Sequence, residues 1–357
     1  MTRTKVAVDG RRLQDDVPGG VARYVAGILT HLATLSDLDI VVVGDGRRGR
    51  PDIDVPFVGL KWMANAPELA WLDGALRPWL NRSGRLFHGT FNQVPLLSSS
   101  RCVVTMHDLS FELHRRDFPP IKAFAWRRYG RHAIRVATHI LTDSEFIRQQ
   151  ILDHFSVAGE RITVAPLGLP DDFLRTARQG TTPATPPYVT ALGGAPRRNL
   201  PVAIDVWRAA RRTLDVDLTL AVVGAEEPPS EPGLLYLGPV DDATWAATLA
   251  GAEALVYPTE YEGYGVPAAE ALVVGTPVVC RRVSSLPEIL GNAGVWADGH
   301  GATAMTTALV RLLQEPTARL AIVERSREQA RRLPSWADSA DAIGAIYRAA
   351  AGMGAGR

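Results

Sequence analysis

The chain has 357 residues, a length that fits two domains of roughly 150 to 200 residues better than a single core. Lysine and arginine total 39 against 38 aspartates and glutamates, so the net charge of +1 lacks the basic excess typical of proteins that bind nucleic acid. Hydrophobic residues make up 46% and charged residues 22%, a balance that is typical of soluble globular proteins and excludes long disordered tails.

The two cysteines, Cys102 and Cys280, lie in different halves of the chain, and neither belongs to a Cys-x-x-Cys pair. We therefore expect neither a disulfide framework nor a zinc site. No stretch reaches the ~18 apolar residues that span a bilayer, and Met1 is not followed by the apolar run of a signal peptide. These features predict a cytoplasmic protein.

Short apolar runs alternate along the chain with segments of helical spacing, which is typical of a parallel sheet flanked by helices. The pattern predicts two doubly wound α/β units. The strands expected in the first unit are 5–8, 40–43, 86–88, 103–106, 140–142 and 162–165, and those in the second are 188–192, 218–223, 235–237, 254–257 and 277–280.

Between the two sets of strands, residues 175–187 read RTARQGTTPATPP and cannot form regular ladders. We interpret this stretch as a linker between an N-terminal domain over 1–174 and a C-terminal domain over 188–335. The last segment, 336–357, carries Ile343, Ile346 and Tyr347 at helical spacing. It is expected to pack on one of the domains, and a return to the first is one of the two possibilities.

The segment 261–279, YEGYGVPAAEALVVGTPVV, follows the strand that ends at Tyr257. Gly263 and Gly265 lack Cβ atoms, so their backbone can approach a bulky anion. Pro267 suits the first helical turn, which predicts a helix that begins at Val266 or Pro267. No Ser, Thr, Asp or Asn occupies the N-cap, so the amides of the first turn are predicted to bind a phosphate.

Two carboxylates flank this predicted phosphate site. Glu270, about one turn into the helix, is expected to accept hydrogen bonds from a ribose diol, and Glu262 precedes the glycines and is expected to reach a sugar. Acidic residues are also common in first helical turns, so each feature taken alone fits an ordinary turn before a helix better than a ligand site. Their combination favours a nucleotide-sugar site.

The segment 261–279 resembles the signature of the retaining glycosyltransferase family 4. The fold of that family, GT-B, consists of two Rossmann-like doubly wound parallel-sheet domains that face each other across a cleft. The family's two glutamates, separated by seven residues, match Glu262 and Glu270, and further matches follow at 275–278 and 284–288. The resemblance implies donor binding through Gly263, Tyr264, Gly265, Val266 and Glu270.

Other segments resemble the family in the same order. Residues 189–200, VTALGGAPRRNL, are similar to its strand, glycine loop and Pro-Arg-Lys-Asn element, which implies that Arg197 and Arg198 neutralise the donor diphosphate. Arg198 stands where the family has lysine, which keeps the charge but changes the geometry of the hydrogen-bond donors. A solvated helix start is the alternative interpretation of this pair.

In the first domain, Gly19 and Gly20 follow the first strand as the family's N-terminal glycine loop does, which implies donor contacts. Residues 105–109, TMHDL, resemble its His-Asp element, in which the histidine, here His107, reaches the transferred sugar. A purely structural histidine is the alternative. Residues 87–90 and 143–146 also resemble family elements, and Ser144 is a candidate N-cap.

The resemblance implies a retaining transfer of a hexosyl group, with mannosyl from GDP-mannose as the first choice. The donor is a nucleotide-diphosphate sugar, and the acceptor is a hydroxyl of a glycan, a lipid-linked glycan or a secondary metabolite. His107, Glu262, Arg197 and Arg198 are the implied catalytic residues. We expect no metal or other cofactor, because the Asp-x-Asp patterns at 37–39, 52–54 and 215–217 fit chance alternation.

Three other functions remain open from the sequence: a nucleotide-sugar epimerase, a phosphorylase on the same fold, and a binding module without chemistry. The segment 113–136 interleaves seven basic residues with four aromatic ones. It fits either a helix at the inner face of an anionic membrane or a helix with one packed and one solvated face.

Overall fold

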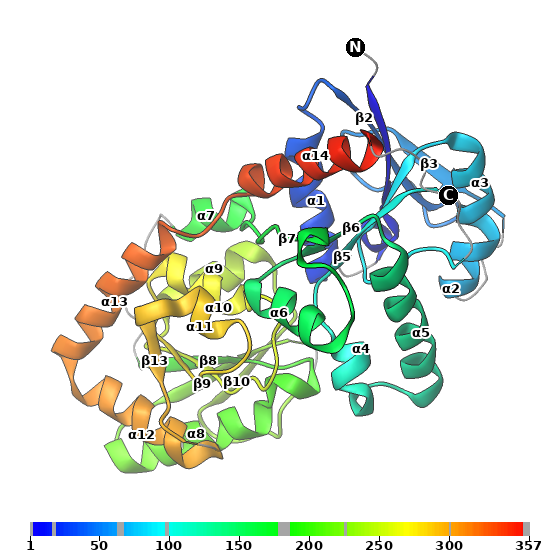
Figure 1. The fold of residues 1–357 in the computed structure, drawn as a ribbon. Helices are drawn as coiled ribbons and strands as arrows, with labels where there is room; N and C mark the ends of the chain where they lie inside the picture. Colours follow the sequence, from blue (N-terminus) through cyan, green and yellow to red (C-terminus); the bar gives the residue numbers. More distant parts are fainter. Residues whose placement is uncertain are drawn as a thin grey trace. The chain divides into compact units, whose positions relative to one another are not determined.

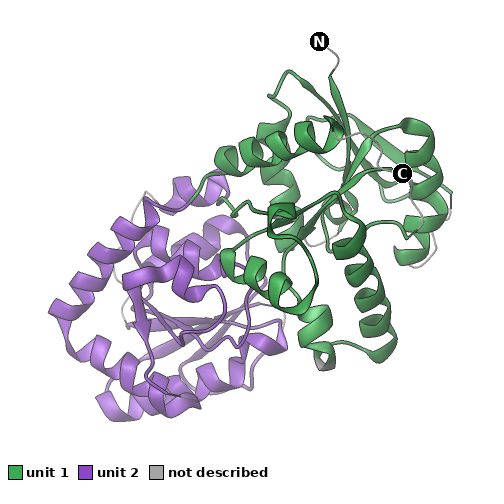
Figure 2. Cartoon of the chain, in the orientation of Figure 1, with its two compact units in different colours: residues 1–168, 334–357 green, residues 169–333 purple. Residues whose placement is uncertain are grey.

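The computed structural model describes residues 3–15, 19–62, 68–96, 100–177, 186–224, 227–299 and 301–352. The chain divides into two compact units: unit 1 comprises Met1–Gly168 and Pro334–Arg357, and unit 2 comprises Leu169–Leu333 (Figure 2). The division follows Gly168, whereas the sequence placed the end of the first domain at 174. Of the predicted linker, residues 175–177 belong to a helix of unit 2, and 178–185 lie outside the described residues.

Unit 1 contains a seven-stranded parallel sheet in the order β3-β2-β1-β4-β5-β6-β7. Its central strands are buried along most of their length, as is typical of parallel sheets with helices on both faces (Figure 1). The strands are β1 (Thr4–Asp9), β2 (Leu38–Asp45), β3 (Phe57–Leu60), β4 (Leu86–Gly89), β5 (Cys102–Met106), β6 (His139–Thr142) and β7 (Ile162–Val164). The helices are α1 (Gly20–Leu32), α2 (Glu68–Trp71), α3 (Arg77–Ser83), α4 (Ser110–Leu113), α5 (Pro120–Val136), α6 (Glu145–His154) and α14 (Trp336–Gly352).

Unit 2 contains a six-stranded parallel sheet in the order β10-β9-β8-β11-β12-β13. Its strands are β8 (Tyr188–Leu192), β9 (Thr219–Val223), β10 (Leu234–Gly238), β11 (Leu255–Tyr257), β12 (Val278–Cys280) and β13 (Gly294–Trp296). Its helices are α7 (Asp171–Ala177), α8 (Leu200–Leu214), α9 (Asp242–Gly251), α10 (Val266–Val274), α11 (Leu286–Leu290), α12 (Gly301–Gln314) and α13 (Pro316–Ala330).

Both sheets share one topology. In each, the first strand of the unit lies beside the fourth, and the order runs in opposite directions on the two sides of that pair. This is the Rossmann order, in which ligands bind outside the carboxyl ends of the strands where the order reverses. The prediction of two doubly wound parallel-sheet units is confirmed.

Every strand predicted from the sequence is present, whereas β3 and β13 were not predicted. Both are short edge strands that pair on one side only, with β2 and β12 respectively. A glycine and partly exposed residues interrupt their apolar pattern, so the sequence offers little to distinguish them from loops.

Helix α14 belongs to unit 1, where it packs against α1. Its first residue, Trp336, is buried against two glycines: a Cβ added to Gly27 would lie 2.3 Å from the indole, and one added to Gly168 would lie 2.7 Å from it. Farther along the helix, the Tyr347 hydroxyl lies 2.5 Å from His88 Nδ1 on β4. Helix α14 is therefore an integral part of the core of unit 1.

Candidate active site

Two neighbouring strands of unit 2 end at the residues that the sequence singled out. β8 and β11 pair at the point where the strand order reverses. β8 leads through a glycine loop into the 3-10 turn Pro196–Arg198, and β11 leads through 258–265 into α10. The fold therefore brings the arginine turn and the loop that carries Glu262 to the edge of the sheet where doubly wound proteins bind ligands.

Hydrogen bonds join the arginine turn to the loop after β11. The Arg197 carbonyl oxygen accepts from the Glu260 amide at 2.9 Å and from Thr259 Oγ1 at 3.3 Å. Asn199, in the left-handed region with a φ of 55°, donates to Glu260 Oε1 at 3.1 Å. The two bonds to Arg197 use only its backbone carbonyl, so they leave its guanidinium group available to bind a ligand.

The two guanidinium groups have different surroundings. Arg198 Nη1 donates to the Gly193 carbonyl at 2.9 Å, whereas Arg197 Nε is buried and finds no acceptor among the described residues. Both arginines lie close enough to Tyr257 to lower the pKa of its hydroxyl. Burial and the Glu262 carboxylate outweigh them and raise that pKa well above its ordinary value. Positive charge is thus concentrated beside a phenol–carboxylate pair.

Glu262 lies on the loop before α10 and is 9% exposed. Its Oε1 accepts from the Tyr257 hydroxyl at 2.5 Å and from Thr259 Oγ1 at 3.1 Å. Ser285 Oγ donates to the Tyr264 carbonyl at 2.7 Å and fixes the loop from the other side. The Glu262 carboxylate is therefore held in one orientation. The bonds from Tyr257 and Thr259 both use its Oε1.

Helix α10 begins at Val266, as the sequence predicted. Its N-cap, Gly265, has a φ of 92° and makes no side-chain capping bond. The positive φ and the closeness of Leu286 Cδ2, 2.9 Å from a Cβ added there, both require glycine. Pro267 lies in the first turn. The predicted helix start without a side-chain cap is confirmed, with Gly263 and Tyr264 directly before it.

Glu270 lies on α10 and is 2% exposed. Its Oε2 accepts from Trp245 Nε1 of α9 at 2.7 Å. From the sequence we expected this carboxylate to bind a ribose. The contact with Trp245 was not predicted, because the two residues meet only through the packing of α9 on α10. The ribose contact stays a prediction.

In unit 1, Gly19 caps the start of α1 with a φ of −89° and a ψ of −177°, and Gly20 is the first helical residue. A Cβ added to either would meet no atom of a described residue within 4 Å. Packing therefore does not require glycine at these positions, and their donor contact stays a prediction. Pro18, which precedes them, lies outside the described residues.

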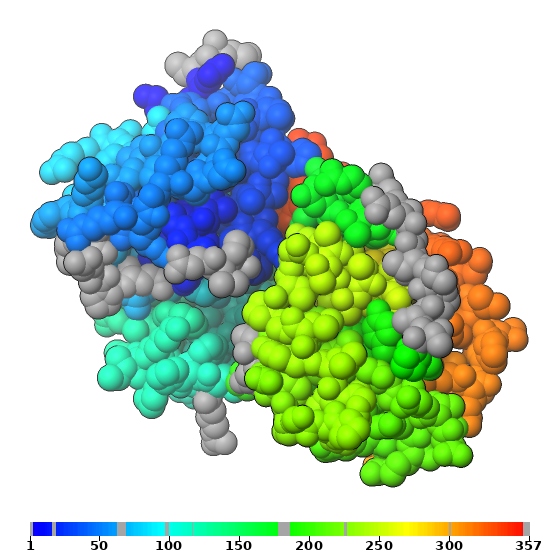
Figure 3. Space-filling view, turned by 180° about the vertical axis from the view of Figure 1, so that it is seen from behind, coloured from blue at the N-terminus to red at the C-terminus, as the bar shows by residue number. Residues whose placement is uncertain are grey.

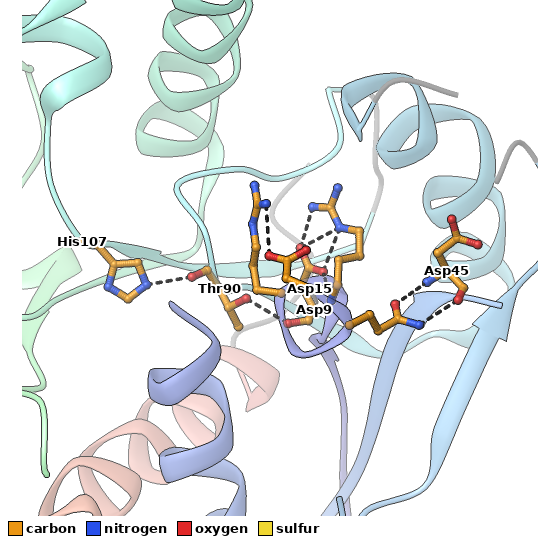
Figure 4. Close-up of polar contacts among 8 residues, drawn as sticks. Asp9, Asp15, Asp45, Thr90 and His107 are labelled. Atoms are coloured by element: carbon orange, nitrogen blue, oxygen red, sulfur yellow. Dashed lines mark hydrogen bonds and ion pairs between the residues drawn. The ribbon is translucent and has the colours of Figure 1, made fainter. Parts of the chain in front are cut away.

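His107 follows β5 directly, and its ring is held from two sides. Nε2 lies 2.8 Å from the Thr90 carbonyl oxygen (Figure 4), and Nδ1 lies 2.7 Å from Asp143 Oδ2. The ring of Tyr24 packs edge-on at a centroid distance of 4.8 Å. With both nitrogens engaged inside unit 1, the expected contact of His107 with a sugar stays a prediction.

These partners determine the charge of His107. The Thr90 carbonyl can only accept, so Nε2 carries a proton, and an ionised Asp143 requires a second proton on Nδ1. Burial alone would lower the pKa of His107, but the charge and hydrogen bond of Asp143, together with the Thr90 carbonyl and the charge of Asp108, raise it above its ordinary value. When His107 is protonated, it forms a buried ion pair with Asp143.

The sequence did not reveal the polar groups around this histidine. Asp143 was noted only as part of the segment 143–146, although its Oδ2 holds the ring. Asp9, at the end of β1, binds Arg11 at 2.7 Å, and its backbone oxygen accepts from Thr90 Oγ1 at 2.8 Å (Figure 4). Burial raises the pKa of Asp9, and Arg11 reverses that effect, so the net shift is downward. The only sign of Asp9 and Asp143 in the sequence is their position, since Asp9 ends a strand and Asp143 directly follows one.

The Asp-x-Asp patterns form no metal site in the described part of the chain, where no group of three His, Cys, Asp or Glu side chains is placed to hold an ion. Instead, three of these aspartates pair with arginine: Asp37 with Arg348, Asp39 with Arg85, and Asp217 with Arg211. Among the same residues, no helix is long and apolar enough to cross a bilayer.

Comparison with known proteins relates both units to one group of enzymes. The family model described as "Glycosyltransferase Family 4" matches residues 18–173, and that described as "Glycosyl transferases group 1" matches 186–315. The O-antigen chain mannosyltransferase B of Escherichia coli is 28% identical over 271 residues, which cover 70% of this chain and 71% of that protein.

Solved structures show the same fold at low sequence identity. WaaG, a glycosyltransferase involved in lipopolysaccharide biosynthesis, is 14% identical with a TM-score of 0.73 over 96% of this chain and 99% of its own. Anabaena Alr3699/HepE, in complex with UDP and glucose, is 13% identical with a TM-score of 0.71 over 97% of this chain and 100% of its own. Together with the two family models, these likenesses establish that the chain belongs to the family 4 glycosyltransferases and has the GT-B fold.

Proposed function

We propose that the chain transfers a hexosyl group, with mannosyl as the first choice, from a nucleotide-diphosphate sugar to a hydroxyl of a glycan, a lipid-linked glycan or a small secondary metabolite, with retention of anomeric configuration. The arginine turn bonded to the Glu262 loop at the strand reversal of unit 2 is the observation that carries this proposal. The name of the E. coli relative supports mannose, and the UDP in the HepE structure supports a nucleotide donor.

In this proposal, Arg197 and Arg198 stabilise the diphosphate as it leaves the sugar, together with the amides near Gly263 and the start of α10. Preorganised donors of this kind act where negative charge develops in the transition state. The departing phosphate accepts the proton of the acceptor hydroxyl. Positive charge is supplied by side chains, so we propose that transfer needs no metal ion.

The carboxylates orient the donor in this scheme. Glu262 presents the oxygen that Tyr257 and Thr259 do not use to a hydroxyl of the sugar. Glu270 accepts hydrogen bonds from the ribose diol, either in place of its bond with Trp245 or in addition to it. His107, as an imidazolium, would exchange its bond with the Thr90 carbonyl for a sugar oxygen.

Transfer assays with GDP-mannose, UDP-glucose and a dTDP-sugar test the reaction and its donor. Arg197→Ala combined with Arg198→Ala is expected to lower the rate at least ~100-fold, the cost of losing one or more charge-stabilising donors. The matched control is Arg331→Ala with Arg332→Ala, an exposed arginine pair on the same unit. Equal rates for the two double variants would refute the role of the arginine turn.

The rival functions differ in their need for an acceptor. An epimerase would convert the donor sugar without any acceptor, and a binding module would bind donor without releasing nucleotide. Release of nucleoside diphosphate that depends on an added acceptor is expected here. Epimerised donor, or tight donor binding with no release under any acceptor, would support one of the rivals instead.

We propose, second, that α5 contacts an anionic membrane surface. Ile121 is 87% exposed and Phe124 is 70% exposed, and α5 contains no acidic residue. The segment lies at the surface of unit 1, as the turquoise atoms in Figure 3 illustrate. Two of its arginines, Arg127 and Arg131, share the single negative charge of Glu112. Lys122 and the remaining arginines are left to meet anionic headgroups.

Sedimentation with lipid vesicles tests this contact. The protein is expected to bind vesicles that contain phosphatidylglycerol, and Ile121→Ser with Phe124→Ser is expected to abolish that binding. Leu320→Ser, at a residue of unit 2 that is 67% exposed, is the control and should bind like the unchanged protein. Equal binding to purely zwitterionic vesicles would argue against an electrostatic contact.

A further inference from the structure

A cavity of about 650 Å³ lies at the amino edge of the unit 1 sheet, the edge opposite to the one that carries His107. The first residues of β1 and β4 line it, together with the residues just before β5 and the ends of α3 and α14. Its volume is within the range of ~300–1,000 Å³ that is usual for small-molecule sites. Neither the sequence motifs nor the proposed transfer reaction uses this edge.

The charged residues that line the cavity are all basic. Five basic residues line it, Arg3, Lys5, Arg85, Arg101 and Arg348, and none of its lining residues is acidic. The chain as a whole carries 39 basic and 38 acidic residues, so this is a local concentration of positive charge. Such a concentration raises the local density of small anions.

Two of these charges are compensated by neighbours. Arg85 binds the Asp39 carboxylate at 2.8 Å, and Arg348 binds Asp37 through two bonds of 2.5 and 3.1 Å. These ion pairs hold both guanidinium groups in place at the cavity wall.

The other three charges meet no carboxylate in the described part of the chain. Arg101 donates to the carbonyl oxygens of Ala350 and Ala351 in the last turn of α14, which are neutral acceptors left over at a helix end. Arg3 and Lys5 are exposed and make no bond with any described side chain. Three cations without a carboxylate partner among the described residues therefore line one cavity.

We propose that this cavity, called here the basic cavity, binds a small anion with at least two phosphate charges, of the chemical class of a diphosphate. Charge-assisted bonds from Arg3 and Lys5 would reach one phosphate, and Arg101 would reach the other while it keeps hold of α14. The bound anion would then tie the starts of β1 and β5 to the C-terminal turn of α14.

Calorimetry with inorganic pyrophosphate at low salt tests the proposal on the full chain. Because Arg197 and Arg198 are themselves proposed to bind a diphosphate, the titration uses the Arg197→Ala, Arg198→Ala variant, in which the donor site of unit 2 has lost both of these charged side chains. Pyrophosphate is expected to bind this variant. Its affinity should fall about tenfold or more when Arg3→Ala and Lys5→Ala are added, since two charged donors are lost.

The matched control adds Arg47→Ala and Lys61→Ala, two exposed basic residues of unit 1 away from the cavity, and should leave the affinity unchanged. An equal loss in the control would mean general attraction to positive charge and would overturn the proposal, as would the absence of binding. Hydrogen exchange gives an independent readout: pyrophosphate should slow exchange in 345–352, and protection confined to unit 2 would contradict a site in this cavity.

Discussion

The ion pair between His107 and Asp143 predicts that Asp143→Asn lowers the free energy of unfolding by a large amount that depends on pH. The side chains are 14% and 3% exposed and their nearest atoms, Nδ1 and Oδ2, lie 2.7 Å apart, so the pair is buried. Removing one partner of a buried pair costs ~3–5 kcal/mol. Asparagine retains an acceptor for the Nδ1 proton, so we expect the lower end, about 3 kcal/mol.

The loss should depend on pH because it is the protonated ring that Asp143 stabilises. The pKa of His107 is raised in the folded chain, so its contribution to stability is fully present below the unfolded value of 6.5. It disappears as the pH rises through the folded pKa. Without the carboxylate, burial dominates and lowers the pKa, so the variant should lose most stability between about pH 5 and 6.5.

Thermal unfolding at pH 6 and pH 9, followed by tryptophan fluorescence, measures this effect. At ~2–4 °C per kcal/mol for a domain of this size, the midpoint at pH 6 should fall by roughly 6–12 °C. The loss at pH 9 should be clearly smaller. Asp172→Asn, which removes an exposed partner of Arg175, is the control and should cost less than ~1 kcal/mol at either pH. An equal loss for Asp143→Asn at both pH values would refute the charged histidine.

Three further outcomes are expected. Tyr257→Phe removes the hydroxyl that donates to Glu262 at 2.5 Å, so initial rates of transfer should fall roughly 10–100-fold, and an unchanged rate would contradict the orienting role of this bond. Trp336→Ala should lower the free energy of unfolding by ~3–5 kcal/mol in urea titrations, whereas Trp62→Ala, at a residue 68% exposed, should change it by less than ~0.5 kcal/mol. Transfer should persist in excess EDTA, and a loss restored by Mg²⁺ or Mn²⁺ would show that the arginine pair does not suffice.

Local patterns in the sequence predicted much of the fold. Apolar runs and turns located all the strands that form the interior of both sheets, and the glycine–proline pattern placed the start of α10 at Val266. Ser144 caps α6 by accepting from the Ile147 amide, as expected. These features depend on neighbours in the sequence, so a single chain is enough to predict them.

The partners of the candidate residues could not be predicted in the same way. His107 and Asp143 are 36 residues apart, and Glu270 and Trp245 are 25 apart, so only the packing of strands and helices brings them together. Glycine, proline and charge patterns identify which residues are special. They do not tell whether a carboxylate faces a ligand or a buried tryptophan.

The placement of α14 has a consequence for the order in which the chain folds during synthesis. Unit 1 is assembled from both ends of the sequence, with Leu169–Leu333 inserted between them. On the ribosome, the inserted unit can complete its core while the first one still lacks the helix that covers α1 and binds His88. In nascent chains halted before residue 336, protease should therefore cleave residues 1–168 more readily than the inserted unit, although residues 1–168 emerge first.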